Sequence, residues 1–326
     1  MAKLKLLQNY PLIKVETDQI SDEPGRFCMS YGFDNSALRR SISHVGIINK
    51  PYIYKDNKGV IEVVTGYRRI LALKELNIKE IKCFDLTDSG MSSFDMLKFA
   101  IYDNLFIREY NVVEKSLIIN RLISLVKDNN SINEIIFLIN ISYKDYGLIL
   151  KIKDLDKSIK KSIALNSLNL KTLEQLVNLD MDSQIICNSW ISKLNLSFNQ
   201  QIQFIDLIID ISRIEKKPIS KLLDDEYYRG LFADQKKNTP QKAKEIIDSL
   251  RQRRNPDYSK YKHIFETRVR KLQLPKNIKI SHPRYFESEF YHVEIEFKDG
   301  NELLNSLNEL VNIDGLTSIG DPWLKE

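Results

Sequence analysis

The stretch VVTGYRRILALKEL, residues 63–76, joins a β-branched run to an apolar helical pattern and decides the fold of the first part of the chain. It predicts a strand, a tight turn at Gly66 and a helix. Arg68 and Arg69 stand side by side where that helix begins. A glycine permits close approach of a ligand, a helix N-terminus offers N–H donors, and guanidinium groups fork onto phosphate oxygens. The stretch therefore suggests a phosphate site. The alternative is an arginine pair that bonds carboxylates and covers the core.

The sequence on both sides of this stretch predicts an α/β domain. A tight DNKG turn joins the second and third of four predicted strands, which cover residues 12–15, 50–54, 60–65 and 81–85. Helical spacing predicts helices at residues 35–44, 67–76 and 93–105. The first of these helices begins at a capping Asn35 or Ser36, and Gly46 is expected to end it.

The rest of the chain has a different pattern. From residue 112 to about residue 226 it is helical almost throughout, with asparagines at the breaks. A polar stretch at residues 232–260 predicts one charged helix and a flexible joint. A helix, two strands and a closing helix then predict a small module. Its second strand alternates cleanly and has one apolar face, of the kind that docks on another domain or on a second copy.

These patterns predict an α+β multidomain chain. The expected parts are an α/β N-terminal domain at residues 1–110, an all-helical domain at 111–230, a basic linker or helix at 231–257, and a small α+β module at 258–326.

The composition suits a folded chain of several domains. The 326 residues are 43% hydrophobic and 29% charged, which permits a sizeable core. No apolar run reaches the length of a membrane span and the N-terminus does not read as a signal peptide, so we expect a cytoplasmic protein without a membrane partner. Three cysteines without a CxxC pair and four histidines without ligand spacing argue against a zinc site or a disulfide framework.

Two regions could contact DNA. Residues 236–279 hold 14 Lys or Arg against four Asp or Glu, which suggests a polyanionic partner through Arg251, Arg253 and Arg254; the alternative is a solvated basic helix face. Predicted helices at 131–138 and 143–152 have the length of a degenerate helix-turn-helix. The second helix and the residues after it offer Lys144, Lys151 and Lys153, with little chemistry for reading base edges.

A second motif, DNLFIREYNVVEKS, begins at Asp103 and leads into the helical region. Asp103 and Asn104 are a reasonable oxygen donor set for Mg²⁺, which takes a few protein ligands together with phosphate oxygens. Arg108 could supply a further phosphate contact. The alternative is a helix cap with a surface salt bridge.

Together these motifs resemble those of the ParB-type partition proteins. GYRRILAL resembles their GxRRxxA phosphate motif, DNLFIREYNVVEKS their ENxxR motif, and LRRSISHVGIINKPYIY their helix–glycine–strand segment. The resemblance covers about residues 10–115 and is fainter over 116–180. It implies a ParB/sulfiredoxin-like N-terminal domain that binds CTP with Mg²⁺ and acts as a nucleotide-gated clamp on DNA. It also implies a homodimer and a partition ATPase as partners.

The resemblance also assigns roles to residues of this chain. Phosphates would be held by Gly66, Arg68 and Arg69, Mg²⁺ by Asn104 with Asp103, and the base or ribose would lie against Gly46. Arg108 would be the motif arginine, and Arg26 would match an N-terminal arginine of the family.

One departure from the family pattern affects the expected chemistry. Tyr67 stands where the partition proteins usually have Glu and where sulfiredoxins have their catalytic cysteine. A phenol orients water or metal poorly, so we expect nucleotide binding with slow or absent hydrolysis, at most a slow nucleoside triphosphatase.

Two other functions compete with this interpretation. One is a transcriptional or mobile-element accessory or interaction protein that keeps the ParB-like fold but has lost nucleotide binding. The other is a phosphoryl-transfer enzyme on the same fold, which the sequence favours less because no candidate base stands near GYRR.

Overall fold

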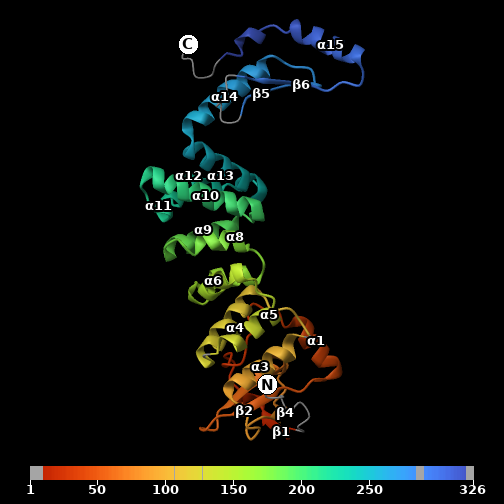
Figure 1. The fold of residues 1–326 in the computed structure, drawn as a ribbon, viewed down its shortest axis with the longest axis vertical. Coiled ribbons are helices and arrows are strands. Elements are labelled where there is room, and N and C mark those ends of the chain that lie inside the picture. The colour runs from red at the N-terminus through yellow and green to blue at the C-terminus, as the bar shows by residue number, and fades with distance from the viewer. Residues whose placement is uncertain (1–9, 106, 127, 284–289, 321–326) are drawn as a thin grey trace. The chain divides into compact units, whose positions relative to one another are not determined.

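The computed structural model describes residues 10–105, 107–126, 128–283 and 290–320, and Figure 1 traces them along the chain. The chain divides into two compact units, Met1–Ser192 and Lys193–Glu326. None of the described helices combines the length and hydropathy needed to cross a membrane.

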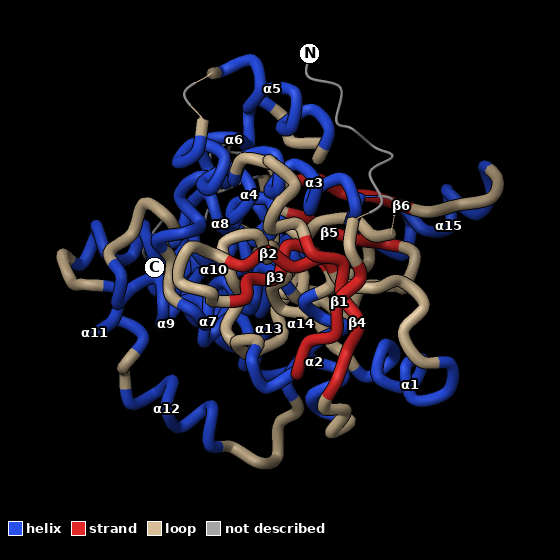
Figure 2. The backbone as a smooth tube through the Cα atoms, turned by 90° about the horizontal axis from the view of Figure 1, so that it is seen from below, coloured by secondary structure: helices blue, strands red, loops and turns tan. Residues whose placement is uncertain are grey.

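The first unit contains a mixed four-stranded sheet in the order β1-β4-β2-β3, drawn red in Figure 2. Its outer pairs are antiparallel, and the central pair β2–β4 is parallel. The four predicted strands are confirmed as β1 (Leu12–Glu16), β2 (Tyr52–Lys55), β3 (Ile61–Thr65) and β4 (Glu80–Asp85). Strand alternation turns alternate side chains, such as Ile53, Val63 and Cys83, into the core.

Helices complete this core. The 3-10 turn η1 (Thr17–Gln19) follows β1, and the three predicted helices are confirmed as α1 (Ser36–Val45), α2 (Tyr67–Glu75) and α3 (Ser93–Leu105). Ile70 and Leu73 of α2 are buried against the sheet because they share one face of the helix. Asn35 does stand at the start of α1, but its amide donates to the carbonyl of Arg68 at 3.2 Å and does not cap the helix.

The remainder of the first unit is helical, as predicted. The elements are α4 (Val112–Leu125), α5 (Asn129–Leu138), α6 (Tyr143–Lys151), η2 (Ile152–Asp154), α7 (Lys157–Ala164), α8 (Leu170–Leu176) and α9 (Met181–Lys193). Helix α4 packs against α5, α6, η2 and α7. Asparagines do mark the breaks: Asn140, Asn166 and Asn195 all have φ near +50°, which Asn tolerates better than most residues.

The second unit begins with helices that pack pairwise. They are α10 (Phe198–Glu215), α11 (Ile219–Leu223), α12 (Glu226–Ala233), α13 (Thr239–Arg254) and α14 (Pro256–Lys271). The long helices α10 and α13 bury apolar stripes against each other, including Ile208 and Ile246. The charged helix predicted in the polar stretch is α13, and Asn255 alone separates it from α14.

The C-terminal module has the predicted order of elements. Strands β5 (Ile278–Ser281) and β6 (His292–Ile295) pair antiparallel, and α15 (Gly300–Val311) and η4 (Leu316–Ser318) follow. Phe265, Leu272 and Ile280 form its core. The predicted apolar strand face is covered in part: Tyr291 packs against this core, whereas Val293 and Phe297 are each 51% exposed.

Candidate functional site

The first unit contains a cleft of about 390 Å³ between the loop at residues 27–30, the end of α1, the start of α2 and the end of α3. The six residues that the sequence predicted for nucleotide contact all line it: Gly46, Gly66, Arg68, Arg69, Asn104 and Arg108. These residues come from segments far apart in the chain. The fold therefore assembles them into one cavity of a size suited to a small ligand.

Gly66 forms the turn between β3 and α2. Its φ of 89° lies in the left-handed region, and a Cβ atom there would be 2.8 Å from the Cβ of Pro51. Both observations require glycine at this position. Because the residue adjoins the first turn of α2, its backbone brings the N-terminal end of that helix to the wall of the cleft.

Arg68 faces the cleft with unused donors. Its guanidinium carbon lies 4.3 Å from the centre of the Phe33 ring, and its Nη2 lies 3.6 Å from a carboxylate oxygen of Glu114. Its Nε is buried and has no hydrogen-bond partner among the described residues. Burial and the nearby Arg108 lower the pKa of Arg68, while Glu114 opposes the shift. The side chain as a whole is 27% exposed, and this open part is what an anion in the cleft could contact.

Arg69 has a different environment. Its Nη1 donates to the carbonyls of Asn49 and Lys50, and its Nη2 lies 3.6 Å from the carboxylate of Asp103. Burial lowers the pKa of Arg69, and Asp103 opposes that shift. The sequence offered two interpretations of the arginine pair, a phosphate site and a structural pair that bonds carboxylates. Each interpretation fits one of the two residues. Arg69 bonds a carboxylate and carbonyls within the fold, and Arg68 keeps donors for a ligand.

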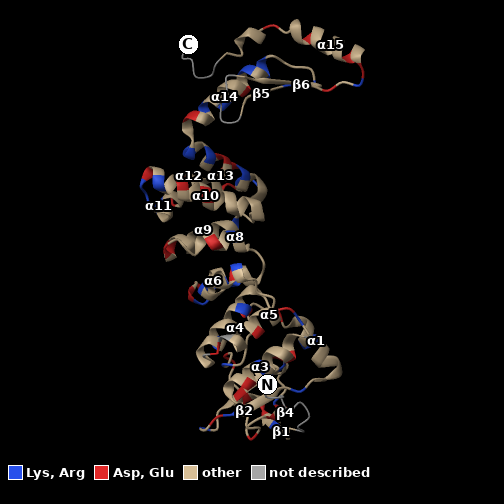
Figure 3. Cartoon of the chain, in the orientation of Figure 1, with Lys and Arg blue, Asp and Glu red and all other residues tan. Residues whose placement is uncertain are grey.

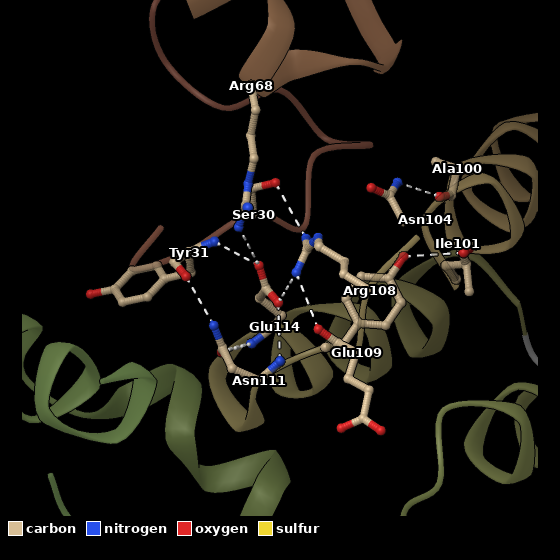
Figure 4. A network of polar contacts seen from close by, with 11 residues as sticks. Ser30, Tyr31, Arg68, Ala100, Ile101, Asn104, Arg108, Glu109, Asn111 and Glu114 are labelled. Carbon is tan, nitrogen blue, oxygen red and sulfur yellow. Dashed lines mark hydrogen bonds and ion pairs between the residues drawn. The ribbon is translucent and has the colours of Figure 1, made fainter. Parts of the chain in front are cut away.

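The two predicted magnesium ligands are separated by this ion pair. Asp103 faces Arg69 and does not line the cleft, whereas Asn104 does. The Asn104 amide nitrogen donates to the Ala100 carbonyl at 2.8 Å, and Figure 4 shows its oxygen on the opposite side. No group of three or more His, Cys, Asp or Glu side chains suited to a metal occurs in the described part of the chain. A Mg²⁺ ion here would therefore depend on ligand phosphates, with Asn104 as its protein contact.

Arg108 is held by a carboxylate that the sequence interpretation missed. Its Nη1 donates to Glu114 at 2.5 Å, and its Nη2 donates to the hydroxyl of Ser30 at 3.5 Å. Glu114 also accepts from the backbone N–H groups of Tyr31 at 3.1 Å and Asn111 at 3.0 Å (Figure 4). The spacing Asn111-x-x-Glu114 is that of a capping box, which is the signal that could have identified this residue.

Tyr67 and Arg26 lie at the edge of the site and are occupied by other contacts. The Tyr67 hydroxyl donates to the carbonyl of Asp22 at 2.6 Å, and burial raises its pKa to about 12. It lines the cleft as a neutral phenol that is already bonded. Arg26 forms a 2.7 Å ion pair with Glu62 and is not among the cleft residues.

The DNA-contact candidates of the first unit are accessible. Lys144 and Lys151 lie on α6 and Lys153 lies on η2, and all three are exposed. Helices α5 and α6 are joined by a short turn through Asn140, whose carbonyl accepts from Lys115 at 3.0 Å. These features are compatible with the predicted helix-turn-helix, which remains a prediction.

The three candidates of the second unit are paired with acids. Arg253 donates to both carboxylate oxygens of Glu215 at 2.5 and 2.8 Å, and this bidentate contact raises the pKa of Arg253. Arg254 pairs with Asp210 at 3.3 Å, and Arg251 pairs with Asp248 at 2.7 Å. Asp210 and Glu215 belong to α10 and Asp248 to α13, and Figure 3 shows basic and acidic residues together on α13. Each arginine already has an acidic partner that offsets its charge. The argument that these three arginines bind DNA is therefore weaker than it was from the sequence alone.

Comparison with known proteins finds solved ParB structures. The C-terminally truncated chromosome-partitioning protein ParB from Caulobacter crescentus complexed with CTP-gamma-S is 15% identical, over 56% of this chain and 98% of that one, with a TM-score of 0.27. The same truncated protein complexed to the centromeric parS site is 13% identical, over 60% and 98%, with a TM-score of 0.34. A Pnob8-like ParB-N domain is 16% identical, over 74% and 98%, with a TM-score of 0.36.

No protein-family model and no curated protein matches the sequence. The likeness to the ParB structures has low identity and low TM-scores, so any function must be inferred from the cleft itself.

Proposed function

We propose that the first unit binds a nucleoside triphosphate, CTP with Mg²⁺ in the first instance, as the ligand of a ParB-like switch on DNA. The observation that carries the proposal is the convergence of Gly66, Arg68, Asn104 and Arg108 on one cleft. CTP is the nucleotide that the sequence resemblance implies. The cleft supports a polyphosphate because it combines a helix N-terminus with guanidinium donors that are only partly used.

The rest of the cleft suits the nucleoside. Besides the arginines and a few polar residues such as Ser41 and Asn49, the cleft is lined by the apolar side chains of Phe27, Leu38, Ile42, Ile47, Ile48 and Val64. An apolar wall beside a cationic end fits a ligand with a flat base and an anionic tail. Gly46, where α1 ends, lies on this wall and leaves room for a ligand because no heavy atom beyond its chain neighbours lies within 4 Å of where its Cβ would be.

The proposed chemistry is binding without rapid hydrolysis. Tyr67 adjoins the phosphate corner, but a phenol with a pKa of about 12 that already donates to a carbonyl is a poor general base. Asp103 is paired with Arg69 and Glu114 with Arg68 and Arg108. Neither carboxylate lines the cleft, so neither is placed to orient an attacking water.

DNA and a second copy are the proposed partners. The exposed lysines of α6 and η2 support a salt-dependent contact with DNA.

Self-association is supported by apolar side chains uncovered on the C-terminal module, at Val293, Phe297, Leu304, Leu307 and Val311. Replacing Leu304 and Leu307 by Asp should lower the mass measured by light scattering from dimer to monomer. An unchanged mass would show that Leu304 and Leu307 are not part of the dimer contact.

Titration of the full chain with CTP, ATP and GTP in the presence of Mg²⁺ tests the nucleotide site. Arg68→Ala should weaken binding by at least about tenfold, since a charge-assisted contact to phosphate is lost. Arg39→Ala is the matched control, because Arg39 forms an exposed 3.5 Å pair with Glu75 outside the cleft. Absence of binding to all three nucleotides at millimolar concentration would sink the proposal.

One observation favours a second candidate function. Within the described residues, the hydrogen bonds and the ion pair of Arg69 are all made to groups of the fold, as a purely structural arginine requires. A ParB-fold interaction protein that has lost nucleotide binding would have this feature. In that case Arg68→Ala would change stability modestly and leave DNA or protein binding intact.

A further inference from the structure

Glu114 combines full burial with a negative charge beside the cleft. Its side chain is 0% exposed and does not line the cavity, yet its two oxygens face two arginines that do. Oε1 lies 3.6 Å from Nη2 of Arg68, and Oε2 lies 2.5 Å from Nη1 of Arg108 (Figure 4). One carboxylate outside the cleft lining therefore contacts both guanidinium groups and can fix their positions.

The contacts of Glu114 exceed what a helix cap requires. A buried charge is costly unless it is paired and hydrogen-bonded. A neutral glutamine fills the same place in a capping box. Two other capping boxes in the described chain use glutamine, Gln200 at the start of α10 and Gln241 at the start of α13. The charge at Glu114 is thus needed for something besides the helix, and the two arginines are its partners.

We propose that Glu114 is a positioning residue for the phosphates, which holds Arg68 and Arg108 by one amino group each so that their other donors face the ligand. The inference rests on the proposed nucleotide site. Each guanidinium has five N–H donors in a fixed plane, so fixing one of them orients the rest. The Arg68 side chain lines the cleft and is 27% exposed, so part of its guanidinium is open to a phosphate oxygen.

The test compares Glu114→Gln with Asn111→Ala in the full chain. Glutamine keeps the cap on the Asn111 N–H and removes the charge. Asn111→Ala removes the other half of the same capping box, the bond from the Glu114 N–H at 3.0 Å, and leaves the carboxylate beside the arginines. Affinities for CTP, CDP and CMP with Mg²⁺ are measured by calorimetry, together with thermal unfolding.

Glu114→Gln is expected to weaken CTP binding on the order of tenfold, as happens when groups that orient metal ligands are lost. CMP, with one phosphate, should lose much less. Asn111→Ala should lower the unfolding temperature and leave the ratio of CTP to CMP affinity unchanged. That ratio does not depend on the folded fraction. If Glu114→Gln does not fold, the ratio is measured on Glu114→Asp. Aspartate keeps the charge, but its side chain is one methylene shorter, so the carboxylate lies farther from Arg108.

Two results would overturn the inference alone while wild-type binding persists. One is a CTP to CMP ratio that Glu114→Gln leaves unchanged or increases. The other is an equal fall of the ratio in Asn111→Ala, which would assign the effect to the contacts of Asn111, namely the helix cap and its 2.9 Å bond to the Tyr31 carbonyl. Absence of nucleotide binding by the wild type would instead overturn the proposed function, and with it this role of Glu114.

Discussion

Arg69 and Asp103 form an ion pair with 3.6 Å between Nη2 and Oδ2, which ties the first turn of α2 to the last turn of α3. Their side chains are 17% and 30% exposed. The pair explains why two adjacent arginines differ in role. Arg69 holds together the segments that form the wall of the cleft, and Arg68 keeps donors free for a ligand. It also engages Asp103, one of the two Mg²⁺ ligands that the sequence suggested.

Asp103→Asn should therefore act on stability. We expect the free energy of unfolding to fall by about 1–3 kcal/mol, because a half-buried guanidinium loses its charged partner. Urea unfolding followed by circular dichroism measures this loss. The Mg²⁺ dependence of CTP binding should persist in Asp103→Asn and weaken in Asn104→Ala. The reverse pattern would identify Asp103 as the metal ligand.

Gly66→Ala and Gly46→Ala separate backbone strain from crowding. Both glycines have positive φ. Alanine in the left-handed conformation of Gly66 costs about 1–2 kcal/mol, and alanine at Gly46, whose φ of 70° and ψ of −164° lie in a region adopted almost only by glycine, costs about 1–3 kcal/mol. At Gly66 the new methyl group also meets Pro51 at 2.8 Å, which adds about 1–3 kcal/mol of overpacking. Gly66→Ala should thus be the less stable variant in a denaturant titration. Equal midpoints would mean that Pro51 shifts freely.

Arg253 should matter for stability more than for DNA. Arg253→Ala is expected to cost about 2–3 kcal/mol, since it leaves Glu215 without its bidentate partner. Arg251→Ala, at an exposed pair with Asp248, should stay within about 1 kcal/mol. Fluorescence anisotropy with duplex DNA, at a temperature where both variants are folded, should give nearly wild-type affinity. A clear loss in Arg253→Ala alone would restore its DNA role.

The cysteines should resist modification in the native protein. Cys28, Cys83 and Cys187 are all buried, and burial raises the pKa of Cys83 to about 12. The thiolate is the reactive form, so at about pH 8 a disulfide reagent such as DTNB should react slowly. After unfolding in guanidinium, all three thiols should react at once. A fast native phase would point to local opening, and protection by CTP would assign it to Cys28, which lines the cleft.

Tyr67 predicts a loss of stability in alkali. Its folded pKa of about 12 exceeds the ordinary value of 10, so the unfolded chain loses this proton first as pH rises. The stabilisation is complete below pH 10 and disappears as pH approaches 12. Tyr67→Phe should lose the Asp22 hydrogen bond, about 1 kcal/mol, and should show a shallower decline between these pH values. Identical slopes for the two proteins would contradict the assignment.

The sequence predicted the first domain well because its signals are local. Alternation, helical spacing and a glycine turn fix β3 and α2, and the resemblance to partition proteins ordered the remaining pieces of the cleft. The direction of the Asp103 side chain depends on Arg69, a distant residue, and no local pattern reveals such a pairing. The same applies to Arg253, whose partner Glu215 lies on another helix. Glu114 carried a local signal, its capping box, but its contacts with the arginines are long-range.

The approach of Pro51 to Gly66 also bears on how this site can change over generations. A side chain at position 66 has no room while the proline ring stands at position 51. The two positions lie on different strand ends, and two of the three close atoms are Cβ and Cα of Pro51, at 2.8 and 2.9 Å, which would remain if another residue with a side chain replaced the proline. Loss of the proline alone would therefore not open position 66 to a side chain, and we expect chains that keep this strand–helix turn to keep its glycine whatever residue stands at 51.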